Sequence, residues 1–181
     1  MATSPSISNY YIGKGIVYFR KDGNSDFRDL GNATVFEFAP NITQLDHFSS
    51  RTGVKTKDRS VITEKSATIN LTLEEWTLDN LRLAFLGGNV DANSSGNQAF
   101  AIFAANQIDG ELRFVGTNDV GPRYEIDLPN VSFIPGKSIN PISEGWGALE
   151  LVGNVLADTN GDFGTIELLG EEEDASDTSN A

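Results

Sequence analysis

The fold is decided between Ser60 and Gly88, SVITEKSATINLTLEEWTLDNLRLAFLGG, where one secondary-structure period replaces another. From Lys65 to Leu73 apolar side chains alternate with uncharged polar ones, which is the period-2 pattern of a half-buried antiparallel strand. After Trp76 the apolar side chains recur at helical spacing instead. The stretch therefore predicts a strand followed by a short helix over about 78–86.

The two ends of this helix carry recognisable signals. Thr77 is a good N-cap residue, and Gly87-Gly88 can supply a left-handed exit from the last turn. A rival register begins the helix at Thr72, which forms a capping-box pattern with Glu75. We favour the later start because the strand alternation continues past Thr72.

The rest of the chain reads as further strands separated by turns. A helix of about three turns is marginal in water by itself, so we expect it to lie against a sheet. The predicted fold is mainly β (α+β): an antiparallel β-sandwich or barrel with one flanking α-helix. Additional strands are expected over Gly15–Arg20, Ala33–Phe38, Glu111–Val115, Arg123–Phe133, Trp146–Leu156 and Thr165–Leu169. Pro40-Asn41 is expected to end the second of these strands, Asp109-Gly110 to form a hairpin turn, and Pro129 to cause a break or bulge. The apolar run Gln98–Gln107 is expected to form either a buried strand or one helical turn.

Length and composition fit one domain. The 181 residues can bury a core of ordinary size, and we expect a single β-sandwich domain over residues 1–170. Residues 1–9 are expected to be a flexible arm. Residues 171–181, EEEDASDTSNA, have no apolar periodicity and are expected to be a disordered acidic tail.

The segment 42–60 is the longest irregular connection in the sequence. A connection of this length is usually functional or disordered. It is either a solvated surface loop or an arm or hairpin that docks on a neighbouring acidic subunit, and the sequence leaves both open. Its residues 51–59 have a local net charge of +3 in a chain whose net charge is −13.

The sequence offers little catalytic chemistry. There are no cysteines and one histidine, His47, so neither a thiolate metal site nor a nucleophilic dyad suggests itself. No phosphate-cradling loop, dinucleotide fingerprint or nucleophile elbow is present. We expect no enzyme, no cofactor and no metal, and we expect neither a signal peptide nor a membrane span.

Several segments, taken in order, resemble the major tail tube protein of long-tailed, siphophage-type bacteriophages. The segments that carry the resemblance are NYYIGKGIVYF, RDLGNATVFEFAP, HFSSRTGVKTKDRSV, LTLEEWTLDNLRLAFLGG and YEIDLPNVSFIPG, followed by a strand ending GNVLAD. They span most of residues 9–169.

The resemblance implies a structural virion protein made in the host cytoplasm. Six copies would close into a ring, and rings would stack into a hollow, non-contractile tail tube that surrounds the tape-measure protein and later conducts DNA during ejection. Tail-tip and tail-terminator proteins would be its other partners, and no membrane is involved. Closing a ring would also remove the open sheet edges that make a lone sandwich prone to aggregate.

Two groups of residues are candidates for this assembly. Those expected to face the lumen lie opposite the apolar side of their strands: Glu37, Glu64, Thr68, Asn70, Glu125, Asp127 and Glu150. A negative lumen would repel DNA phosphates. Those expected to contact a neighbouring subunit or ring lie in the long connection: Arg51, Lys55, Lys57, Asp58 and Arg59.

The alternative from a different class is a monomeric β-sandwich that binds carbohydrate or another ligand. Trp76 or Trp146 would then be an exposed stacking platform. Their positions, beside a helix and within a strand, favour core packing instead.

Overall fold

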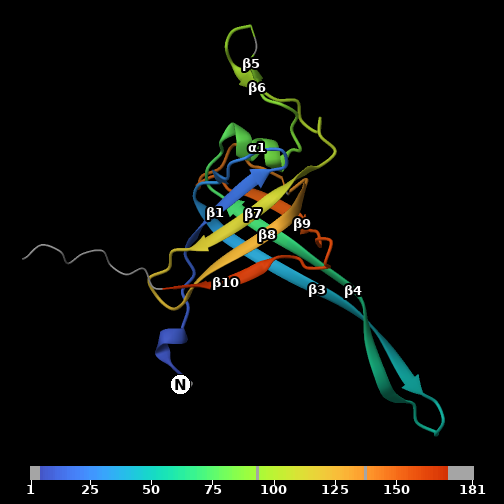
Figure 1. Ribbon diagram of the computed structural model, residues 1–181. Helices are drawn as coiled ribbons and strands as arrows, with labels where there is room; N and C mark the ends of the chain where they lie inside the picture. Colours follow the sequence, from blue (N-terminus) through green and yellow to red (C-terminus); the bar gives the residue numbers. More distant parts are fainter. Residues whose placement is uncertain (1–4, 93, 137, 171–181) are drawn as a thin grey trace, which may run out of the picture.

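The computed structural model describes residues 5–92, 94–136 and 138–170, and most of these residues belong to an antiparallel sheet (Figure 1). The mainly-β fold with one flanking α-helix is confirmed. The strands and helices are η1 (Ile7–Asn9), β1 (Gly15–Lys21), β2 (Arg28–Asp29), β3 (Ala33–Ser49), β4 (Thr56–Leu73), α1 (Leu78–Ala84), β5 (Asp91–Ala92), β6 (Gln98–Ala99), β7 (Ile108–Gly116), β8 (Arg123–Ile134), β9 (Leu149–Val155) and β10 (Thr165–Leu169).

The main sheet folds over on itself but does not close into a barrel. Its strand order is β2-β1-β7-β8-β9-β4-β3, and β10 pairs with the first half of β8. One layer contains β2, β1, β7, β8 and β10; the other contains β9, β4 and β3. The inner faces meet where Phe36 of β3 stacks on Phe114 of β7, with ring centroids 5.1 Å apart. β3 is paired only on its β4 side, which leaves its other edge open within the described chain.

The chain changes from strand to helix between Leu73 and Leu78, as predicted. Ile69, Leu71 and Leu73 of β4 are buried in the core. The side chain of Thr77 caps α1 by accepting a hydrogen bond from the Asn80 backbone N–H, so the rival start at Thr72 is wrong. α1 packs on β9 and β8 and covers one end of the sandwich.

The exit from α1 differs from the prediction. Gly87 donates its backbone N–H to the carbonyl of Arg82, as in a Schellman motif, but the left-handed residue is Leu86, at φ 44°. Leu86 is buried, so packing holds it in a conformation that usually needs glycine.

Two predicted strand ends are also wrong, for identifiable reasons. β3 continues through Pro40 to Ser49, because an edge strand tolerates a proline where no ladder hydrogen bond is needed. Asp109-Gly110 lies inside β7 rather than in a hairpin turn. A side chain at Gly110 would collide with the backbone of Arg20, so glycine here marks close packing of strands.

The predictions for Pro129, for the apolar run 98–107 and for the two tryptophans have different outcomes. β8 contains a register irregularity opposite β7 at Pro129, which confirms the predicted bulge. The apolar run 98–107 contributes only the short β6 before an irregular segment, with Ile102 and Phe103 exposed. Trp76 packs against the core as expected, whereas Trp146 lies before β9 and is 93% exposed. Packing of Trp146 in the core is therefore wrong.

The predictions for residues 1–4 and for the acidic tail, 171–181, lie outside the described residues. Among the helices that are described, none is long and apolar enough to cross a membrane.

Candidate assembly surfaces

The segment 42–60 belongs to a long β-hairpin. β3 and β4 remain paired from Ala33↔Leu73 out to Ser49↔Thr56, so the segment is a regular hairpin rather than an irregular loop. Its docking on a neighbouring acidic subunit stays a prediction. We call residues 42–62 the arm. It projects away from the rest of the molecule (Figure 1) and extends about 30 Å, at about 3.3 Å for each residue of a strand.

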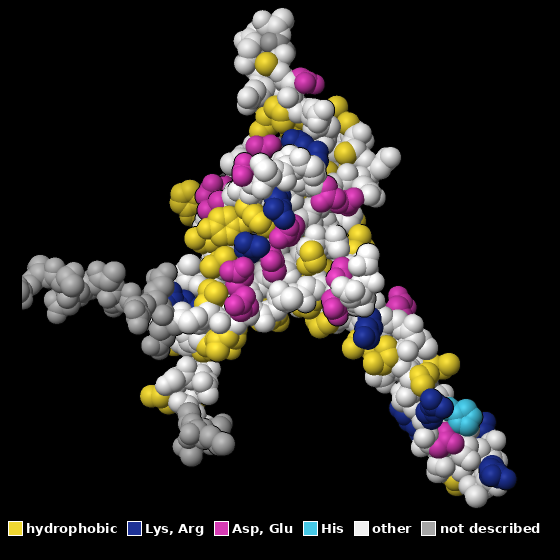
Figure 2. All heavy atoms as spheres, in the orientation of Figure 1, with side chains coloured by type: hydrophobic (Ala, Val, Ile, Leu, Met, Phe, Trp, Pro, Cys, Tyr) yellow, Lys and Arg dark blue, Asp and Glu magenta, His cyan; other side chains and the backbone are white. Residues whose placement is uncertain are grey.

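Both faces of the arm carry exposed apolar side chains. Leu45 and Val61 are paired across one face. Ile62 and Phe48 lie on the other face, where Ser60 donates a 2.7 Å hydrogen bond to Asp46. Leu45 is 64% exposed and Phe48 49%. Figure 2 shows apolar and basic side chains along the whole projection. A two-stranded ribbon has no core of its own, so these side chains are available to a partner.

Some of the charged residues predicted to contact a neighbour already have ion partners within the arm, and others do not. Lys57 lies 2.7 Å from Asp46, and Asp58 lies 2.6 Å from the imidazole of His47. The hydrogen bond from Lys57 holds the pKa of Asp46 below its usual value. Arg51, Lys55 and Arg59 have no ion partner among the described residues. These three cations are the ones free to meet an acidic partner.

The predicted lumen residues divide between two outer faces of the sandwich. Five lie together on the outside of the β3–β4–β9 layer, which we call the polar face: Glu37, Glu64, Thr68, Asn70 and Glu150. The Asn70 amide donates a 3.0 Å hydrogen bond to Glu37 across the strands. The register places Val35, Ala39, Asn41, Thr43, Ser66, Thr72, Val152 and Asn154 on the same face. None of these residues is a lysine or an arginine.

Glu125 and Asp127 lie instead on the outside of the other layer, which we call the ion-pair face. Arg113 makes two 3.0 Å hydrogen bonds to Asp127 and approaches Glu125 at 3.3 Å. The bond to Asp127 raises the pKa of Arg113. Arg20 pairs with Glu111, and the ring of Phe27 lies 4.7 Å from the Arg20 guanidinium and 4.5 Å from that of Arg113. Glu111, Glu125 and Asp127 are therefore paired with arginines of their own layer.

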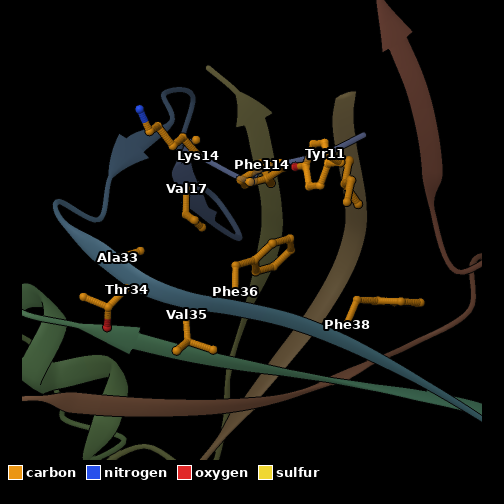
Figure 3. Close-up of a pocket in the computed structure, with 12 residues that line it drawn as sticks. Tyr11, Lys14, Val17, Ala33, Thr34, Val35, Phe36, Phe38 and Phe114 are labelled. Atoms are coloured by element: carbon orange, nitrogen blue, oxygen red, sulfur yellow. The ribbon is translucent and has the colours of Figure 1, made fainter. Parts of the chain in front are cut away.

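A cleft opens between the layers at the free edge of β3. It encloses a cavity of about 450 Å³ between β1 and β3, and we call it the seam. Figure 3 shows Phe36 and Phe38 of β3 directed into it, with Tyr11 and Phe114 opposite. Among the described residues of its lining Lys14 alone is charged, and its ammonium lies 2.9 Å from Asp119. The seam is an apolar surface left open by the incomplete barrel.

No group of carboxylates, histidines or cysteines suited to a metal ion occurs in the described ranges.

Comparison with known proteins gives three findings. A family model described as protein of unknown function UCP028589 matches residues 10–97, just under half of the chain. No curated protein matches. Among solved structures, one similar chain comes from the tail of an empty GTA particle with C6 symmetry: 14% identity, TM-score 0.46, covering 86% of this chain and 96% of that chain.

A second similar chain comes from the six-fold symmetrised baseplate of the anti-feeding prophage (AFP). It is 8% identical, with a TM-score of 0.45, and the alignment covers 94% of this chain and 99% of that one. Both TM-scores lie below 0.5, and neither likeness bears on what this chain does.

Proposed function

We propose that this chain is a structural, non-enzymatic subunit of a phage-type tail tube, which self-assembles into stacked six-membered rings around a channel for DNA. Its partners are further copies of itself, the tape-measure protein and the proteins of the tail tip and terminator. It is made in the host cytoplasm and functions in the virion. The observation that carries the proposal is the arm, which is exposed, apolar on both faces and basic at its tip.

The polar face supplies the lumen in this proposal. Its side chains are threonine, serine, asparagine and carboxylates together with a few small apolar residues, and it has no lysine or arginine to hold phosphate. DNA would therefore pass without electrostatic trapping. Glu125 and Asp127 are left out of the proposed lumen because they belong to the ion-pair face.

Negative-stain electron microscopy of the purified protein, over a range of concentration and salt and with its tail-tip partners, tests the assembly. We expect hollow tubes or stacked rings. A protein that stays monomeric even with the tail-tip and tape-measure proteins would overturn the proposal.

Charge reversal tests the role of the arm tip. Arg51→Glu with Lys55→Glu should hinder tube growth while the monomer keeps its circular dichroism spectrum, because these cations have no partner within the described chain. The control reverses two cations outside the arm, Lys21→Glu with Lys65→Glu. If tubes of the arm variant grew as fast as those of the unmodified protein, the arm-tip cations would have no role in assembly.

Introduced cations test the lumen. Tubes of Asn70→Lys should retain short DNA duplexes that tubes of the unmodified protein release. The matched control is Thr165→Lys, which by register with Asp127 lies on the ion-pair face. Retention by the control and not by Asn70→Lys would place the lumen on the other layer.

A second candidate, a glycan-binding module, is favoured only by the exposed indole of Trp146. Trp146 does not line the seam. Calorimetric titration with a panel of oligosaccharides, with Trp146→Ala as control, distinguishes the two candidates: heat released only by the unmodified protein would favour the glycan module.

A further inference from the structure

The connection between β8 and β9 presents two large apolar side chains to solvent. Ile142 is 92% exposed and Trp146 93%, the two highest values among the exposed large apolar side chains of the described chain. A single exposed apolar side chain is ordinary, but two on one projection are not, and tryptophan is enriched at the energetic centres of protein interfaces. We call residues 140–146 the knob.

The knob is anchored to the body at both of its ends. Ile139, just before it, packs against the core. Gly147, just after it, lies against the ring of Trp76, so closely that a Cβ added to Gly147 would be 3.0 Å from that ring. The indole of the knob is therefore displayed outside the core from two fixed points. Such a display reduces the entropy that is lost when the indole binds a partner.

The seam matches an indole in size and polarity. Its cavity of about 450 Å³ lies within the range of about 300–1,000 Å³ that is usual for protein pockets filled by small organic groups. Figure 3 shows its aromatic walls, Phe36, Phe38 and Phe114, which can pack against a further ring. A buried indole N–H needs an acceptor, and the hydroxyl of Tyr11, which lines the same cavity, can supply one.

The knob and the seam also carry complementary charge. The knob has one charged residue, Glu144, which has no ion partner among the described residues. The charged residue of the seam lining is Lys14, whose ammonium has three donors and directs one of them to Asp119. Glu144 and Trp146 are two positions apart and span at most about 7 Å, so an indole in the seam brings the carboxylate to its rim.

We propose that the Trp146 indole of one copy inserts into the seam of a second copy, with Glu144 of the knob against Lys14 at the rim. Within one copy the two surfaces remain apart, since Trp146 is almost fully exposed and does not line the seam. Every copy can therefore give a knob and receive one. This inference rests on the proposed function and names one contact between neighbouring subunits.

Cross-linking between two single-cysteine variants tests the contact, because the chain has no cysteine of its own. Ser143→Cys lies in the knob, and Thr34→Cys lies in the lining of the seam. In a mixed, assembling sample with one variant isotope-labelled, a short bismaleimide should give a mixed dimer that mass spectrometry identifies. The control replaces Thr34→Cys by Thr165→Cys on the ion-pair face and should give none.

The same experiment separates this inference from the proposed function. Tubes that form without the mixed dimer, or a mixed dimer with Thr165→Cys instead, would overturn the inference and leave the proposed function standing. So would a double variant, Ser143→Cys with Thr34→Cys, that cross-links only within one copy, because the knob would then fill its own seam. Failure of the unmodified protein to associate under any condition overturns both.

Truncation of the indole tests its contribution. Trp146→Ala should raise the protein concentration needed for assembly about thirtyfold, as expected for a tryptophan at the centre of an interface. Leu156→Ala removes another exposed apolar side chain, outside the knob, and serves as the matched control. Equal assembly by the two variants would show that the indole is not an anchor and would overturn the inference.

Exchange of the two charges tests the rim contact. Glu144→Lys and Lys14→Glu should each slow association about tenfold at low salt, with a smaller effect at high salt. The variant that carries both substitutions should recover most of the lost rate, because the pair is restored with its signs reversed. Additive losses in the double variant would show that these two residues do not meet and would overturn the proposed orientation.

Discussion

The two halves of the β3–β4 hairpin share one hydrogen-bond ladder but differ in how deeply their side chains are buried. In the inner half, Ile69, Leu71 and Leu73 are buried beneath the second layer and α1. In the outer half, every residue from Thr56 to Lys65 is exposed, although the strands remain paired. Backbone pairing alone therefore does not make a core. The inner half stabilises the monomer, and the outer half leaves its side chains exposed, as the proposed assembly requires.

The largest expected effect separates the two halves by stability. Leu71→Ala should lower the free energy of unfolding by about 2–5 kcal/mol, because it leaves a cavity in the core. Leu45→Ala in the arm should change it by less than about 0.5 kcal/mol. Urea unfolding followed by circular dichroism measures both. A similar loss from the two substitutions would mean that the arm is part of the folded core.

Glycines give a second contrast. Gly110→Ala should destabilise the protein by about 1–3 kcal/mol through overpacking, since the new methyl group would meet the Arg20 backbone and lie 2.7 Å from the Phe19 ring. Gly53→Ala, at the arm tip, meets no atom within 4 Å. Its thermal midpoint should match that of the unmodified protein; a large decrease would show that the tip is packed.

A smaller effect is expected at the corner between β4 and α1. Thr77→Ala removes the side-chain oxygen that accepts from the Asn80 N–H at 3.2 Å and should cost about 1 kcal/mol. Thr56→Ala in the arm lacks such a role and serves as the control. Equal midpoints in urea for both variants would show that the cap contributes nothing.

The smallest effect is confined to the arm and depends on pH. The pKa of Asp46 is lowered by its hydrogen bonds from Lys57 and Ser60, so the ionised form stabilises the arm. This stabilisation is complete above the usual pKa of 3.8 and is lost as the pH falls through the lowered value. Hydrogen exchange of arm amides should accelerate over that range more in the unmodified protein than in Asp46→Asn. An identical pH dependence in both proteins would rule out the ion pair as the cause.

The comparison also explains which features could be predicted from the sequence. The switch at Thr77 is local, because alternation, cap and helical spacing all occur within one stretch. The end of a strand at Pro40 was predicted wrongly because a proline stops a central strand but not an edge strand, and the sequence does not show which strand has no second neighbour. The predicted strand at Trp146 begins too early: β9 starts only at Leu149, so the indole lies before the strand and is exposed.

The candidate site was predictable only in part. Alternation identifies the polar side of each strand, and it correctly separates Glu37 and Asp127 from the core. It does not say to which layer a strand belongs, so residues of two opposite faces were assigned to one lumen. The seam had no sequence signal, because Phe36, Phe38 and Ile126 look like ordinary core residues until the open edge of β3 is known.

The one-sided placement of the arm has a consequence for how a chain of copies can start and stop. If each copy of the proposed assembly gives its arm to the next copy, a stack has unlike ends: one presents projecting arms and the other presents surfaces that have received no arm. A protein that begins the stack and a protein that closes it then need opposite shapes, one resembling the donor and the other the acceptor. Growth from one end can thus be controlled independently of growth from the other.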